Sequence, residues 1–154
     1  MSTVAPAPTV PDLACRPLRR AFAVNAVFSV LAGLVMLAGA DPLAAALLDL
    51  PEGVLGLSAP LIFAAVGAGT AAFGLFVAIE ARRPEPRLFD ARLILVLDAA
   101  WVIGSLALLA AAPQAFTFWG RLIVADVAAV VALIALAEAA GLGALRRAEA
   151  LAAA

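Results

Sequence analysis

The sequence predicts an all-α membrane protein built as a four-helix transmembrane bundle, and two observations lead to that fold class. Hydrophobic residues make up 66% of the chain and charged residues only 14%, whereas soluble domains are about 45–50% apolar and about 25% charged. The apolar residues are also gathered into four stretches, each close to the roughly 20 residues that a helix needs to cross a bilayer. The predicted spans are 21–40, 60–79, 93–112 and 122–139.

The remaining segments are short. Residues 1–15 are rich in proline and have no apolar periodicity, so we expect a disordered tail. Residues 16–145 form the predicted transmembrane domain, and 146–154 form a second tail. Between the first two spans, Asp41 suits a helix N-cap and Pro42 suits the first helical position. We therefore expect a short helix lying in the membrane interface, and an irregular loop is the alternative.

The arginines predict the orientation. Nine of the ten basic residues fall in the N-terminal segment, the loop between spans two and three, and the C-terminal segment, and only Arg121 falls on the other side. Basic residues in short loops stay in the cytoplasm, so we expect both termini to be cytoplasmic. The use of arginine without lysine and the abundance of alanine are typical of GC-rich bacterial genes. They indicate a bacterial coding sequence.

Composition also excludes several functions. The chain has no histidine and one cysteine, which removes histidine-ligated haem, a thiolate metal site within one chain and most catalytic triads. We therefore expect no metal, no cofactor and no catalytic residue. A net charge of −1 argues against nucleic acid as a partner.

The candidate site consists of polar residues inside the spans. Asp98 lies within span three, where a charged aspartate costs about 2.5–3.5 kcal/mol. Asn25 lies at a similar depth in span one, so we expect the two side chains to be within hydrogen-bond reach. Trp101 and Ser105 follow on the same face of span three, and Asp126 in span four completes the candidate intramembrane polar site. The site either handles a proton or ligand, or fixes the pairing of the helices.

The acidic residues of the spans are expected at different depths in the membrane. Asp126 is expected in the opposite leaflet from Asp98, about 12–15 Å away in depth, so the two cannot form a catalytic pair. Glu80 and Glu138 end spans two and four. We expect both to reach the membrane surface and to pair with loop arginines.

Similar local sequences suggest that the bundle contains two tandem helical hairpins. Asn25–Ala–Val–Phe28 in span one matches Asp98–Ala–Ala–Trp101 in span three. An alanine-rich sequence also gives such matches by chance, so both explanations stay open. Small residues line spans two and four, where they are expected to let helix backbones approach closely. The stripe on span two is Gly67, Thr70, Gly74 and Ala78, and the stripe on span four is Ala125, Ala128, Ala132, Ala135 and Ala139.

These elements together resemble a family of small, uncharacterised four-span integral membrane proteins of bacteria. The resemblance rests on Asp98–Ala–Ala–Trp101–Val102–Ile–Gly–Ser105, on the glycine-rich second span and on Gly141–Leu142. It implies a four-helix fold in a bacterial inner membrane and carries no activity with it. Such proteins often have asparagine where this chain has Asp98.

Two functions from different classes follow. The first is an interaction or accessory subunit, or a membrane scaffold, whose partners are the lipid bilayer and either another membrane protein or a second copy. The alternative is a small proton-coupled transporter or permease that uses Asp98 and Asp126. An enzyme ranks third. The first two differ in whether the acids border a connected polar cavity or are sealed by side-chain contacts.

Overall fold

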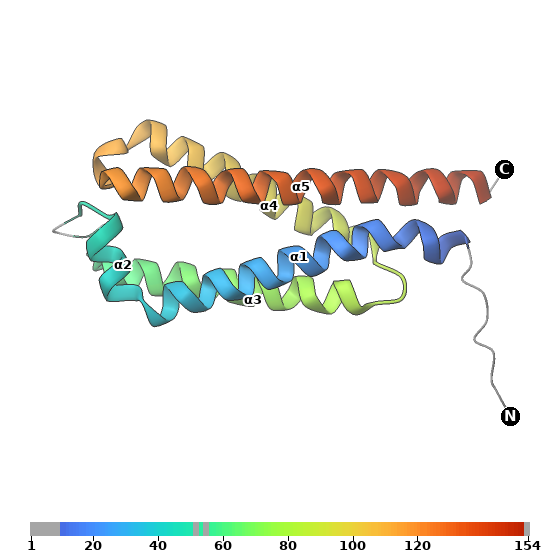
Figure 1. Cartoon of the computed structure of the whole chain (residues 1–154), viewed down its shortest axis with the longest axis horizontal. Coiled ribbons are helices and arrows are strands. Elements are labelled where there is room, and N and C mark those ends of the chain that lie inside the picture. The colour runs from blue at the N-terminus through green and yellow to red at the C-terminus, as the bar shows by residue number, and fades with distance from the viewer. Residues whose placement is uncertain (1–9, 51–52, 54–55, 153–154) are drawn as a thin grey trace, which may run out of the picture.

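The computed structural model describes residues 10–50, 53 and 56–152, and this part of the chain is almost entirely helical. It confirms the all-α, four-helix bundle, with one short additional helix and a single turn of 3₁₀ helix (Figure 1). In chain order the elements are α1 (Val10–Ala38), α2 (Ala40–Leu47), α3 (Ala59–Arg82), α4 (Leu88–Ala111), η1 (Pro113–Ala115) and α5 (Phe118–Ala152).

Four of these helices are long and apolar enough to cross a membrane, which is the architecture of a multi-pass membrane protein. The qualifying stretches are Cys15–Ala38, Ala59–Arg82, Leu88–Ala111 and Phe118–Leu151. The start of α1 and the end of α5 lie at one end of the bundle, here called the terminal end (Figure 1). The short helix α2 lies at the other end, here called the α2 end.

Helix extends into both segments that were expected to be tails. α1 begins at Val10 although its eighth residue is Pro17, and α5 continues to Ala152. The extension of α1 is stabilised by packing, because Cys15 joins a buried cluster with Leu142 and Leu145 of α5. The extension of α5 consists mainly of Ala, Leu, Arg and Glu, which are strong helix formers. Residues 1–9 and 153–154 lie outside the described part of the chain.

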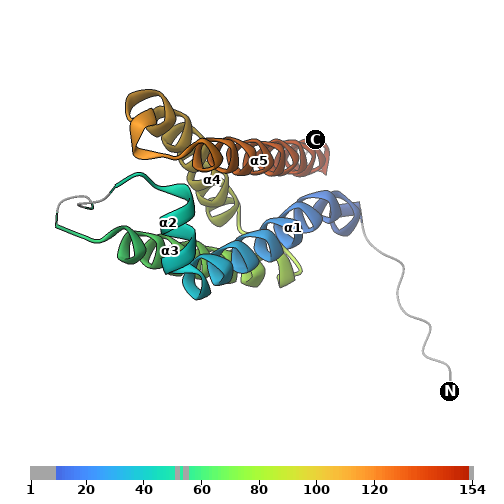
Figure 2. The same ribbon diagram turned by 60° about the vertical axis from the view of Figure 1, so that its left-hand side comes forward.

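The long helices pack in the order α3, α1, α5, α4. α1 lies between α3 and α5, α4 packs mainly against α5, and α3 and α4 make few contacts with each other (Figures 1 and 2). The bundle is therefore two hairpins, α1–α3 and α4–α5, joined along the seam between α1 and α5. The buried core near the terminal end contains Leu18, Phe22, Val77, Ile94 and Leu142.

Glycines bring α1 and α3 into close contact. A Cβ atom added at Gly33 would lie 2.5 Å from the backbone nitrogen of Ala71, and one added at Gly74 would lie 2.7 Å from that of Val30. Both distances are too short for a side chain. Gly74 belongs to the small-residue stripe predicted on span two, so the structure confirms that this stripe serves close helix packing.

The predicted short helix is present, but its start was predicted wrongly. Gly39 is the N-cap residue, and Asp41 lies within the first turn. There its negative charge interacts favourably with the positive end of the helix dipole. α2 then ends because the following backbone pairs with the segment before α5. Leu48 forms an antiparallel bridge with Phe116, and Thr117 N–H donates to Leu47 O at 3.1 Å. We call this contact between 47–49 and 115–117 the backbone bridge.

Candidate functional site

A cluster of four buried polar side chains lies in the interior of the bundle. Asn25 and Ser29 come from α1, Asp98 from α4 and Glu138 from α5, and each is between 1% and 5% exposed. We call these four residues the polar cluster. Because α1 belongs to one hairpin and α4 and α5 to the other, the cluster joins the two halves of the molecule.

The side-chain amide of Asn25 organises the polar cluster. Its Nδ2 donates to Asp98 Oδ2 at 2.6 Å and to Glu138 Oε1 at 2.8 Å, and its Oδ1 accepts from Ser29 Oγ at 2.9 Å. The amide therefore uses both of its N–H donors and its carbonyl oxygen. The predicted contact between Asn25 and Asp98 is confirmed.

The prediction for Glu138 was wrong. It was expected at the membrane surface with an arginine, but its side chain is 1% exposed and bonds to Asn25. The sequence did contain a signal for this position. Buried residues on α5 recur every three or four positions, and Glu138 occupies one place in that stripe. The stripe comprises Ala128, Val131, Ile134, Glu138, Leu142 and Leu145.

The arrangement places two carboxyl groups around one amide. Asp98 and Glu138 both accept a hydrogen bond from Asn25 Nδ2. Among the described residues, Glu138 Oε2 has no hydrogen-bond partner. Two carboxylates this close repel when both are charged, and a protonated carboxyl group can donate a hydrogen bond. The polar cluster is thus chemically able to hold a proton between its two acids.

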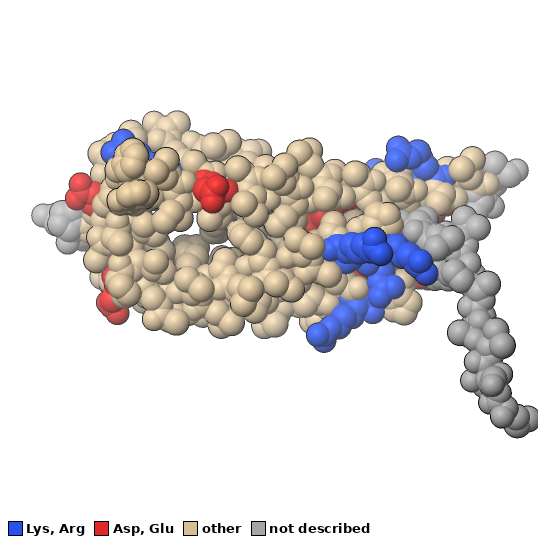
Figure 3. Space-filling model, viewed as in Figure 1, with Lys and Arg blue, Asp and Glu red and all other residues tan. Residues whose placement is uncertain are grey.

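The other predicted members of the site lie outside the polar cluster. Trp101 is 38% exposed, Ser105 is half-buried and Asp126 is exposed on α5. The reason is the course of α4, whose buried residues are Ala91, Ile94 and Asp98, all in its first half. The second half of α4 diverges from the α1–α3 hairpin. Figure 3 shows the surface hollowed between the two hairpins on the side toward α2.

Glu80 has a buried position like that of Glu138 but a different partner. Its side chain is 1% exposed, and its Oε1 pairs with Arg83 Nε at 2.8 Å. The expected pairing with a loop arginine is confirmed, whereas the expected exposure at the surface is wrong. Val77–Ala–Ile–Glu80 in α3 also resembles Ala135–Leu–Ala–Glu138 in α5, so Glu80 and Glu138 are equivalent in the suggested tandem repeat. Their different partners follow from the packing order, because α3 makes few contacts with α4 and so Glu80 has no part in the polar cluster.

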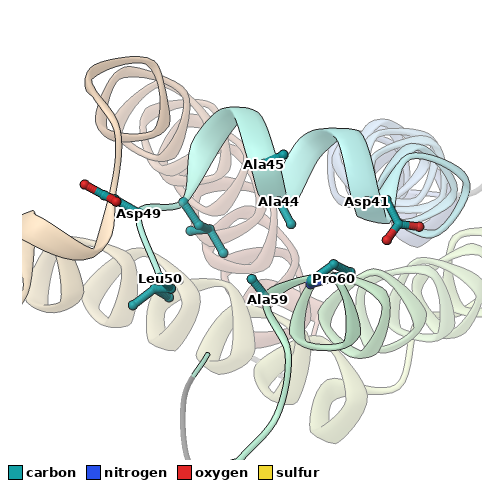
Figure 4. Close-up of a pocket in the computed structure, with 8 residues that line it drawn as sticks. Asp41, Ala44, Ala45, Asp49, Leu50, Ala59 and Pro60 are labelled. Carbon is teal, nitrogen blue, oxygen red and sulfur yellow. The ribbon is translucent and has the colours of Figure 1, made fainter. Parts of the chain in front are cut away.

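Two surface cavities lie away from the polar cluster. One is a pocket of about 430 Å³ beside α2, with Asp41 and Asp49 at its opposite ends (Figure 4). The two carboxylates are thus too widely separated to act as a pair. The other is a groove of about 860 Å³ between α1 and α5 near the terminal end. The described residues include no group of three or more potential metal ligands.

Comparison with known proteins found no matching family model, no matching curated protein and no matching solved structure. The fold and the site therefore define the class of protein by themselves. It is an all-α, multi-pass membrane protein whose two helical hairpins are joined by a buried, carboxylate-rich polar cluster.

Proposed function

We propose that this protein is a lateral interaction subunit or scaffold of the bacterial inner membrane, which binds a helix of another membrane protein or of a second copy. The observation that carries this proposal is the open side of the bundle between α3 and α4. Helices of a closed four-helix bundle pack around a common core, whereas α3 and α4 each have only one extensive long-helix neighbour here.

The surfaces of α3 and α4 suit contact with another helix. A Cβ atom added at Gly69 or at Gly104 would meet nothing within 4 Å. Small residues on open helix faces allow a second backbone to approach closely within a membrane. Large apolar side chains are exposed on the same two helices, among them Leu61, Leu75, Ile79, Val96, Ile103 and Leu106.

The sealed polar cluster also favours a structural role for its acids. Asp98 is 4% exposed, and neither it nor Glu138 lines either of the two cavities described above. A hydrogen-bonded cluster of this kind fixes which helices pair. Each such bond contributes about 1 kcal/mol or less within a membrane.

The distribution of basic side chains supports the proposed orientation, in which both termini are in the cytoplasm. Basic side chains gather toward the terminal end on α1, α3 and α5 (Figure 3). Phe118 and Trp119 are exposed at the α2 end, with ring centroids 5.6 Å apart, where aromatic residues suit a membrane–water boundary. The resemblance to four-span bacterial proteins supports the same membrane.

Cysteine crosslinking in native membranes tests the interaction. Single cysteines replace Gly69, Gly104 or the buried Ile134 in a chain that also carries Cys15→Ala. We expect disulfide-linked dimers, or adducts of one defined size, from Gly104→Cys or Gly69→Cys and none from Ile134→Cys. Equal, weak crosslinking at all three positions, together with a monomer in mild detergent, would rule out the proposal.

A second function, a small proton-coupled transporter, is favoured by one observation. Two buried carboxyl groups share the Asn25 amide, and one of their oxygens has no partner among the described residues. If this function holds, proteoliposomes show pH-dependent flux that Asp98→Asn abolishes, while Asp126→Asn, an exposed control, retains it. An absence of flux from the wild-type chain would support the interaction subunit instead.

A further inference from the structure

The groove between α1 and α5 combines a basic mouth with apolar walls. Arg16 and Arg20, one turn apart on α1, both line it and both are exposed. Further along the two helices the groove is lined by apolar residues, of which Ile134 is buried and Val24, Leu133 and Ala137 are exposed. Among the residues that the structure describes, no acidic side chain lines the groove.

The two arginines differ from Arg19, which lies between them in the sequence. Arg19 Nε donates to the backbone oxygen of Ala81 at 3.1 Å, so that side chain links α1 to α3. Arg16 and Arg20 make no hydrogen bond or ion pair with any residue that the structure describes. Two exposed positive charges therefore stand at the same mouth with no counter-charge from the described residues.

The length of the groove along α1 can be compared with the thickness of one leaflet of a bilayer. Arg16 lies one residue inside the start of the stretch of α1 that can cross a membrane, so we place its guanidinium group at the level of the lipid headgroups. Val24 is eight residues further along, about 12 Å deeper at the rise of an α-helix. Half of a hydrocarbon core about 30 Å thick is about 15 Å. An acyl chain therefore fits along the walls while a phosphate meets the mouth.

We propose that this groove is a binding site for one anionic phospholipid, whose headgroup phosphate pairs with Arg16 and Arg20 and whose acyl chain lies between α1 and α5. Basic pockets between transmembrane helices at the cytoplasmic surface bind such headgroups. The groove is formed by α1 and α5 alone. The lipid site therefore does not depend on the proposed interaction at α3 and α4.

Native mass spectrometry of the full chain in mild detergent tests the site. The probes are phosphatidylglycerol and phosphatidylcholine with identical acyl chains. We expect one phosphatidylglycerol to bind in preference to phosphatidylcholine. Arg16→Gln with Arg20→Gln should weaken that binding about 25-fold, on the order of fivefold for each arginine. The matched control, Arg82→Gln with Arg87→Gln, removes two exposed arginines outside the groove and should change binding less than twofold.

Ala137→Trp distinguishes lipid binding in the groove from nonspecific attraction of lipid to surface charge. The tryptophan side chain fills the groove, while Arg16 and Arg20 are both kept. We expect this variant to lose the bound phosphatidylglycerol while its helical circular dichroism and monomer size stay unchanged. Retained binding in Ala137→Trp, or an equal loss in the two double-arginine variants, would overturn the site. Displacement of the lipid by millimolar inorganic phosphate would also overturn it, since that outcome identifies a site for a free anion.

Discussion

Asn25 Nδ2 lies 2.8 Å from Glu138 Oε1, a contact between residues 113 positions apart in the chain. It joins the first transmembrane helix to the last, and the same nitrogen bonds to Asp98 on the third. A single neutral amide is therefore the hydrogen-bond donor to two acidic side chains in an apolar interior. Stability should depend more strongly on this amide than on either acid.

Asn25→Leu should destabilise the protein by about 3 kcal/mol, because it leaves two buried carboxyl groups without their shared donor. The free energy of unfolding in mixed detergent–dodecyl sulfate micelles measures this. Ser29→Ala is the control, since it removes only the bond to Asn25 Oδ1 and should cost about 1 kcal/mol or less. Equal losses from the two variants would contradict the central role of Asn25.

Asp98→Leu should destabilise the bundle more than Asp98→Asn, by about 1 kcal/mol. An asparagine at position 98 keeps a side-chain oxygen that can accept the bond from Asn25 Nδ2, whereas leucine has no acceptor. The same unfolding titration compares the variants. Equal stability of the two would show that this hydrogen bond contributes nothing.

Gly33→Ala and Gly69→Ala make the same chemical change in opposite environments. The new methyl group at Gly33 would lie 2.5 Å from the backbone nitrogen of Ala71, so α1 and α3 must separate, at a cost of about 1–3 kcal/mol. The methyl group at Gly69 meets nothing within 4 Å. It should stabilise helix α3 by about 0.5–1 kcal/mol. Thermal unfolding in detergent measures both changes in stability. An unchanged stability of Gly33→Ala would contradict the close packing of α1 against α3.

Reporter fusions test the orientation of the chain. Fusions at residues 45 and 115, both at the α2 end, should report the external side, and fusions at 86 and 150 should report the cytoplasm, because of the arginine distribution. Alkaline phosphatase and a fluorescent protein give opposite signals on the two sides. An external residue 150 would contradict the orientation, and if residue 86 were cytoplasmic in the same protein it would also contradict the even number of crossings.

The sequence allowed prediction of the four spans and of the contact between Asn25 and Asp98, because both follow from the cost of polar groups in an apolar medium. Glu138 was misplaced for a related reason. Hydrophobicity located the end of the last span near residue 139, but α5 continues to Ala152. A residue that looked terminal is therefore internal to the helix, on its buried face.

The positions of Trp101 and Ser105 outside the polar cluster could not be predicted, for a different reason. Their spacing from Asp98 places them on one face of α4, yet that face leaves the bundle interior after Asp98. The divergence depends on how the two hairpins pack, which helix periodicity does not contain. The end of α2 likewise depends on the backbone bridge between Leu48 and Phe116, residues that are distant in the chain.

The backbone bridge at the α2 end and the polar cluster further along α1 connect the same two hairpins at different depths. At the terminal end, residues 83–87 join α3 directly to α4, and Val77 of α3 and Ile94 of α4 belong to one buried cluster. The space between α3 and α4 is therefore closed at the terminal end and widens toward the α2 end, like a wedge. A molecule that enters this space from the side must do so in the half of the membrane nearer α2.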